Sequence, residues 1–296
     1  MNYRTGIFFV LASGVLWSFH GTIIRQLEDA QAWTVLFWRS LAMLPVLWVL
    51  VSFRSNGAPM KALRASGWIG FLGGLGLVAA MGGAIVAFQT TTVANAAFLL
   101  AASPFLAAII GRLILKEAVS TQTKIAIALA MFGIFVMVKD GLSSGALVGN
   151  VAGLIAALGF AFFSVTLRWS KAGDSLPVTF IGAGLAVLIS GVFAVVTDQG
   201  LAITYSDLAW CVLMGTVTLS GGKLLYTLGS RTVPSAELTL LSNTEVLLAP
   251  IWVWLILGEV ASFGTILGGS IVLVAIAYSA LSRVRRKLPP IAATPV

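Results

Sequence analysis

Two oppositely charged side chains lie inside long apolar segments in the second half of the chain. Lys223 precedes Arg231 by roughly two helical turns and Glu245 follows Pro234 by roughly three, which puts both charges about 12 to 16 Å below a membrane surface. A charge at that depth costs several kcal/mol unless it faces a wet cavity or a partner. We therefore expect Lys223 and Glu245 to face each other. They form either a structural contact between helices or a site where Lys223 binds a carboxylate and Glu245 an ammonium group or a proton.

Aromatic residues recur at helical spacing in two other apolar segments. Trp17 and His20 lie three residues apart, so they share one face of the first segment. The sixth segment repeats this spacing with Phe160, Phe163 and Ser164. We expect the two faces to border a substrate cavity. The alternative is that the rings pack against lipid or neighbouring helices, and that His20 makes a hydrogen bond between helices.

The remaining candidates are polar, aromatic or helix-bending residues of the other apolar segments. The candidate substrate contacts are Asn95, Ser103, Tyr226 and Trp252. The candidate gate or interface positions are Arg39, Pro104 and Pro250. Proline removes a backbone hydrogen bond, and broken helices are where transporters expose backbone groups to a substrate. Arg39 stands near the outer end of its segment, where it is expected either to extend toward the lipid headgroups or to line a gate.

The elements that position these residues are membrane-spanning helices. A chain of 296 residues that is 59% hydrophobic and 9% charged, with a mean hydropathy of +1.02, has too few polar side chains to coat a soluble globule. The formal charge of +8 comes from short basic clusters between apolar runs, which is typical of a cytoplasmic membrane face and not of a nucleic-acid-binding surface. A single cysteine, Cys211, leaves no disulfide framework, and no metal or cofactor site is expected.

Apolar runs long enough to cross a bilayer occur throughout the chain. Dividing the sequence at charges, glycines, prolines and polar clusters predicts ten transmembrane helices at 6–24, 33–53, 67–88, 93–115, 121–139, 147–168, 176–197, 207–229, 234–257 and 262–282. The fold class is therefore an all-α integral membrane protein. The predicted units are residues 1–142, residues 143–284 and a disordered cytoplasmic tail at 285–296.

The two large units are copies of each other. The segment from Leu113 to Ser120 reappears 142 residues later, from Leu255 to Ser262. A period near half the chain length indicates two repeats and not a solenoid of short units. Because each repeat holds five spans, an odd number, equivalent positions fall on opposite sides of the membrane. The repeats are therefore predicted to be inverted.

Loop charges predict the orientation of the bundle. With both termini in the cytoplasm, fourteen Lys and Arg residues lie near the inner ends of the spans and only Arg25 and Lys139 near the outer ends. Basic residues close to spans are retained on the cytoplasmic side, so this split favours cytoplasmic N- and C-termini.

The pattern resembles the drug/metabolite transporter superfamily of EamA type. The resemblance covers nearly the whole chain and is carried by Ser103-Pro104 through Lys116-Glu117 and by Glu245-Val246 through Gly258-Glu259. The chain departs from the family pattern at Val246, where a proline is usual, and has Pro250 one turn later. The resemblance implies a ten-helix bundle with alternating access around a central cavity. It further implies a bacterial inner-membrane exporter, and the chain looks most like exporters of aromatic and other neutral amino acids.

The function that follows is secondary transport of a small metabolite without a cofactor. A drug or nucleoside exporter is the alternative within transport, and an intramembrane enzyme or a non-transporting scaffold is the alternative outside it. No catalytic or metal motif supports the enzyme. Facilitated exchange and proton antiport both fit one membrane-embedded carboxylate. The expected partners are the substrate and the lipid bilayer, without nucleic acid, and the protein is expected to be a monomer.

Overall fold

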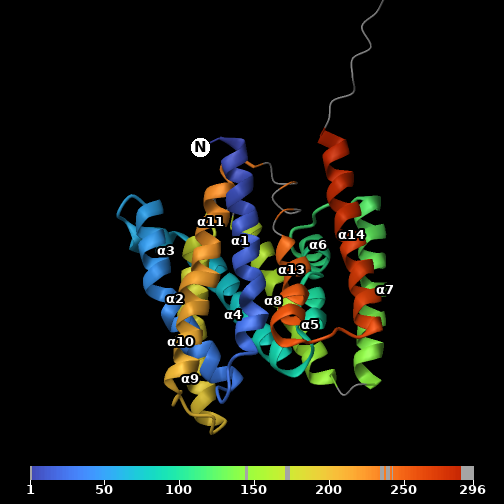
Figure 1. Ribbon diagram of the computed structural model, residues 1–296. Coiled ribbons are helices and arrows are strands. Elements are labelled where there is room, and N and C mark those ends of the chain that lie inside the picture. The colour runs from blue at the N-terminus through green and yellow to red at the C-terminus, as the bar shows by residue number, and fades with distance from the viewer. Residues whose placement is uncertain are drawn as a thin grey trace, which may run out of the picture.

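Long helices make up the computed structural model, which describes residues 2–143, 146–170, 174–233, 237, 241 and 243–287 (Figure 1). Those residues contain no strand. The elements are α1 (Tyr3–Ile24), α2 (Ala32–Arg54), α3 (Pro59–Ala65), α4 (Gly67–Thr90), α5 (Val93–Leu100), α6 (Ser103–Ile114), α7 (Thr121–Ser143), α8 (Leu147–Trp169), α9 (Leu176–Val196), α10 (Tyr205–Leu213), the π-helix η1 (Met214–Gly221), α11 (Gly222–Gly229), α13 (Thr244–Leu257) and α14 (Phe263–Lys287).

Eight described segments are long and apolar enough to cross a membrane, and they match the first eight predicted spans. The other two predicted spans correspond to shorter apolar helices, Thr244–Leu257 and Phe263–Ser279, so ten full-length spans are not confirmed. The beginning of the predicted ninth span and most of the predicted tail lie outside the described residues. α14 continues as a helix to Lys287 and so includes the first three residues of that tail.

Local sequence signals account for the helix ends. The side chains of Asn2, Thr92 and Thr204 accept hydrogen bonds from backbone N–H groups in the first turns of α1, α5 and α10. Gly258 ends α13 in the left-handed conformation (φ 68°) that glycine adopts without strain. The fourth predicted span is broken into α5 and α6 at Ala101 and Ala102, directly before Pro104.

The two repeats run in opposite directions. α1 and α4 end at the same face, where the Arg25 guanidinium donates to the Thr91 carbonyl. α8 is antiparallel to α4, because Gly83 lies against Ala152 whereas Gly76 lies against Gly159. α1 and α8, the first helices of the two repeats, are therefore antiparallel. We name the face with the start of α1 the terminal face and the face with Arg25 the distal face (Figure 1).

Glycines form the seam between α4 and α8 at the centre of the bundle. A Cβ atom on Gly159 would lie 2.6 Å from both the Ala80 nitrogen and the Gly76 oxygen. The two backbones are thus in contact, as small residues permit between membrane helices. α7 and α14 form a similar antiparallel seam, at Gly133 and Gly268, at one side of the bundle (Figure 1).

The distal face is fastened by a buried carboxylate. Asp207, at the start of α10, is fully buried and accepts hydrogen bonds from the backbone N–H groups of Glu28, Asp29 and Ala30. These bonds tie the α1–α2 connection of the first repeat to the second repeat. No sequence pattern singled out this contact, because the donors are backbone groups of a loop.

Candidate functional site

α1 lies between the two helices that carry the predicted charges, as Figure 1 shows for α11 and α13. A Cβ on Gly14 would lie 3.3 Å from Thr244 and 3.5 Å from the Glu245 nitrogen, so this part of α1 packs against the start of α13. One turn further along, Trp17 packs against Gly222, at the start of α11. The glycines let each helix approach α1 closely, and Lys223 and Glu245 border α1 at neighbouring levels.

Three side chains from α1 and α11 form an aromatic group with a cation. The Lys223 nitrogen lies 5.9 Å from the centre of the Tyr226 ring, within the range of a cation–π contact. The Trp17 and Tyr226 rings lie 5.5 Å apart. Trp17 also donates from Nε1 to the Leu219 carbonyl at 3.4 Å. Trp17, Lys223 and Tyr226, all predicted as substrate contacts, are therefore brought together.

The predicted contact between Lys223 and Glu245 is wrong in its geometry. In the described part of the chain neither residue belongs to an ion pair within 4.0 Å. Lys223 lies beside Tyr226 on α11, whereas Glu245 lies in the first turn of α13, the other helix that packs against α1. The physical reason is α1, which packs against both helices and keeps the ammonium and the carboxylate apart. Both side chains are partly accessible.

Trp252 of α13 packs against α1. Its indole Nε1 donates to the Ser18 hydroxyl at 2.8 Å, and its ring stacks on Phe19 at a centroid distance of 4.9 Å. These contacts hold α13 against α1 one to two turns from Glu245. Pro250 lies inside α13, which remains a single described helix across it.

Arg39 does not reach the lipid headgroups or the surface. Its side chain is fully buried, and Nη1 lies 2.7 Å from Nε2 of His20, which also contacts the edge of Phe88 at a centroid distance of 5.4 Å. The Nε and Nη2 atoms of Arg39 have no hydrogen-bond partner among the described residues. The alternative of extending toward the headgroups is therefore wrong, because the side chain is buried against His20 of α1.

Burial of Arg39 beside a single acceptor leads to a stability prediction. His20→Leu leaves the guanidinium without its acceptor and should lower the free energy of unfolding by about 1–3 kcal/mol. The double variant Arg39→Met/His20→Leu removes the polar pair and should be within about 1 kcal/mol of the wild type, or more stable. Unfolding in detergent, followed for the two variants and the wild type, measures the difference. Equal destabilisation of both variants would show that Arg39 has a stabilising partner besides His20.

The α8 residues separate into two groups. Phe163 is buried, and its backbone nitrogen lies against Gly76 in the α4 seam. Val151, Ile155 and Leu158 are exposed on the outer side of α8. Phe160 lies on the opposite, inward side of the helix, and its side chain is nevertheless 47% exposed. Ser164 shares the Phe160 side and donates to the Phe160 carbonyl. Phe160 and Ser164 therefore border accessible space on the inward side of α8, and Phe163 is a packing residue.

The candidates of the fourth span, like those of α8, include both buried and accessible residues. Asn95 is buried and donates to the side chains of Thr91 and Asn150, so it joins α5 to α8. Ser103 is buried at the start of α6, and Pro104 beside it is exposed. The break before Pro104 leaves a short non-helical connection at mid-span, the kind of feature that exposes backbone groups in transporters.

Sequence reasoning missed the π-helix. The eight residues of η1 continue α10 into α11, and the Ser220 hydroxyl donates to the Gly215 carbonyl, five residues earlier. π-helical turns are rare and often mark functional sites. η1 directly precedes Lys223 and accepts the Trp17 hydrogen bond at Leu219. The glycines at 215, 221 and 222 are the signal that could have indicated an irregular helix here.

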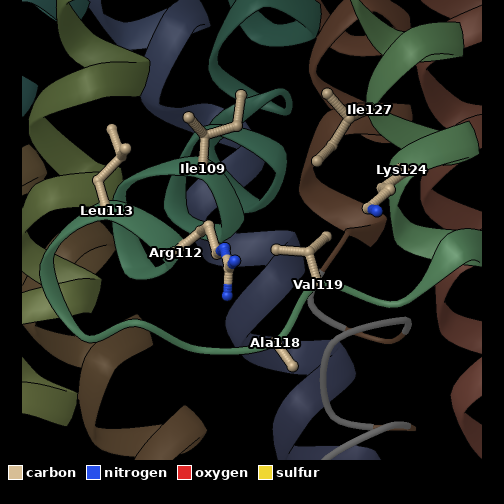
Figure 2. Close-up of a pocket in the computed structure, with 7 residues that line it drawn as sticks. All are labelled: Ile109, Arg112, Leu113, Ala118, Val119, Lys124 and Ile127. Carbon is tan, nitrogen blue, oxygen red and sulfur yellow. The ribbon is translucent and has the colours of Figure 1, made fainter.

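A pocket of about 410 Å³ lies elsewhere, on the terminal face between α6, α7 and the segment that joins them. Figure 2 shows Arg112 and Lys124 among its apolar walls. It is lined by Ile109, Arg112, Leu113, Ala118, Val119, Lys124 and Ile127. None of these is a predicted site residue and none is acidic, so this pocket is distinct from the charged and aromatic group around α1.

Comparison with known proteins adds the family and the fold. The model of the EamA-like transporter family matches the chain twice, over residues 4–139 and 144–281. No curated protein matches the chain in sequence. One solved crystal structure, described only as that of a protein, matches 97% of this chain and 100% of its own length, with a TM-score of 0.66 and 14% identity. At that identity the likeness shows the fold alone, and the two matched ranges follow the two repeats.

Proposed function

The chain belongs to the EamA-like transporter family, and from this premise we propose that it exports neutral amino acids with apolar or aromatic side chains. As a member of that family it is a multi-pass membrane protein that moves small molecules, and the family consists of transporters and not of enzymes. The amino-acid substrate, its direction of movement and its site are parts of the proposal.

The observation that carries the proposal is an ammonium group and a carboxylate on two helices that both pack against α1, with aromatic rings beside the ammonium group. Lys223 lies over the Tyr226 ring, Glu245 lies in the first turn of α13, and the two charges are not paired in the described structure. A zwitterion provides the complement of each charge at once. Lys223 would bind the substrate carboxylate and Glu245 the substrate ammonium group.

The surroundings of the two charges suit an apolar side chain. Trp17 and Tyr226 provide large ring surfaces beside Lys223, and Trp252 packs against α1 about two turns along α13 from Glu245. Rings of this kind bury an apolar substrate side chain with little loss of conformational freedom. A phosphorylated sugar would require several basic groups, and this site has one lysine.

Alternating access through the two inverted repeats would carry the substrate across the bilayer. In the proposed orientation the terminal face is cytoplasmic, the membrane is a bacterial inner membrane, and the protein acts as a monomer. Glu245 can also bind a proton, so exchange of protons for substrate is compatible with the site.

The substrate proposal is tested with purified protein in liposomes. A panel of labelled amino acids should show uptake of phenylalanine and methionine that unlabelled phenylalanine inhibits, with little uptake of aspartate or lysine. Protein-free liposomes are the control. Uptake of nucleosides or lipophilic cations in place of phenylalanine would favour the drug or nucleoside exporter. Absence of transport across the whole panel would favour the non-transporting scaffold.

The orientation gives a separate prediction. In a Cys211→Ala background, Ser206→Cys at the exposed start of α10 should react with a membrane-impermeant thiol reagent in intact cells. Met60→Cys, exposed in α3 at the opposite face, should react only after the cells are opened. The reverse pattern would place the termini outside the cytoplasm and contradict export through this topology.

A further inference from the structure

Two arginine–glutamate ion pairs occupy equivalent positions in the two repeats. Arg25 follows α1 and Arg168 ends α8, 143 residues later, and the glutamates belong to the repeated segment, at Glu117 and, 142 residues later, Glu259. Arg25 pairs with Glu259 and Arg168 pairs with Glu117. Each pair therefore joins one repeat to the other, at the distal face in the first case and at the terminal face in the second.

The distal pair is short and well bonded. Arg25 Nε lies 2.9 Å from Glu259 Oε2, and Arg25 Nη2 donates to the Thr91 carbonyl at 2.7 Å. The second carboxylate oxygen of Glu259 accepts the backbone N–H of Val93 at 2.6 Å. Val93 begins α5, where a negative charge is stabilised by the helix dipole. These bonds tie the end of α1, the start of α5 and the segment after α13 together.

The terminal pair is long and more accessible. Arg168 Nη1 lies 3.6 Å from Glu117 Oε2, beyond hydrogen-bond length, and Nη2 donates to the Ala107 carbonyl at 3.2 Å. The two side chains are 46% and 43% exposed, against 27% and 19% for Arg25 and Glu259. Water and salt weaken a pair of this kind. Equivalent residues are thus tightly joined at one face and loosely joined at the other.

Packing, like the ion pairs, is tighter at the distal face than at the terminal face. At the distal face Val93 is fully buried against Gly21 of α1. In the half of α8 that leads to the terminal face, Phe160 and Ser164 border accessible space on the inward side. The described state is therefore closed at the distal face.

We propose that the two pairs are reciprocal latches that set which face of the transporter is open. In the described state the Arg25–Glu259 pair holds the distal face closed while the Arg168–Glu117 pair is extended. In the opposite state the Arg168–Glu117 pair shortens and the Arg25–Glu259 pair separates. The inference rests on the proposed alternating access but not on the identity of the substrate. The two arrangements use the same repeats and similar packing, so one charge-assisted contact is enough to shift their populations.

Cysteine accessibility tests the latches without any substrate. In the Cys211→Ala background, Val93→Cys reports opening of the distal face, and Ser164→Cys, which borders accessible space in the described state, reports opening of the terminal face. Glu259→Gln should raise the labelling rate at Val93→Cys and lower it at Ser164→Cys. Glu117→Gln should do the opposite. The expected changes are about fivefold or more, the lower end of typical coupling between two states.

Two further variants keep the test decisive. Arg25→Gln leaves the bond from Val93 to Glu259 in place and should shift labelling in the same direction as Glu259→Gln, which covers the case in which the latter fails to fold. Asp174→Asn breaks the Arg54–Asp174 pair, 3.1 Å long at the terminal face, and should leave both reporters unchanged. Three results would overturn the proposal. They are labelling changes of the same sign at both reporters, no labelling change in any of the variants, and an effect of Asp174→Asn as large as that of the latch variants. If the labelling rates shift as expected but the protein does not transport amino acids, the substrate proposal is rejected and the latch proposal stands.

Discussion

Lys223→Met should strongly reduce phenylalanine transport while the protein still folds and inserts. The substitution keeps the length and apolar stem of the side chain but removes the one cation beside Tyr226 and Trp17. A carboxylate bound in a site sheltered from water loses a charge-assisted hydrogen bond, which corresponds to a loss of about 100-fold, or about 2.7 kcal/mol. Initial rates in liposomes, normalised to the amount of folded protein, measure it.

The double variant Lys223→Met/Glu245→Leu separates a structural role from a functional one. Because the two charges are not paired with each other in the described structure, removing both should not rescue transport. A well-folded double variant without transport keeps both charges in the site. A well-folded and fully active double variant would show that neither charge touches the substrate.

Gly159→Leu should prevent the bundle from folding. The Cβ of any side chain here would lie 2.6 Å from the Ala80 nitrogen and the Gly76 oxygen, both backbone atoms of α4. α4 and α8 would have to separate, and the seam between the two repeats would open. We expect a loss of about 3 kcal/mol or more, seen as failure to recover a monodisperse protein from membranes.

Gly184→Leu is the matched control for this substitution. Gly184 lies inside α9, and a Cβ added there meets no heavy atom within 4 Å. The variant should be within about 1 kcal/mol of the wild type, because leucine is also the better helix former. Equal loss in both variants would mean that glycine is required for insertion and not for contact between α4 and α8.

The first eight spans and the repeat could be predicted because they depend on local composition. A run of about 20 apolar residues is sufficient to predict a spanning helix. Pro104 also indicated the position of the break between α5 and α6. The segment from Leu113 to Ser120 and its copy were enough to predict two repeats, which the two family matches support.

The candidate site could be predicted only in part, because it depends on which helix lies between which others. Helical spacing brought Trp17 and His20 to one face, yet Trp17 contacts α11 and His20 contacts Arg39 on α2. Similar depth suggested a Lys223–Glu245 contact, and α1 prevents it. Asn95 has the composition of a substrate ligand, but Asn150, which no pattern paired with it, binds it instead.

The π-helix and the ion pairs could not be predicted, for a different reason. Glycine, threonine and serine in residues 214–221 fit an α-helix as well as a π-helix, so the choice depends on packing against α1 and α2. Arg25 and Glu259 are separated by 234 residues, and each alone is typical of a solvated loop residue.

The most direct test of the proposed site is competition by two analogues, each lacking one charged group of phenylalanine. Phenethylamine lacks the carboxylate and phenylpropionate lacks the ammonium group. Both should inhibit phenylalanine transport by wild-type protein at least about tenfold more weakly than phenylalanine does, because each leaves one charge of the site unmatched. In a Lys223→Met variant with residual transport, phenethylamine should become as good an inhibitor as phenylalanine, while phenylpropionate stays weak. Equal inhibition of the wild type by phenylalanine and both analogues would contradict a zwitterion bound between Lys223 and Glu245.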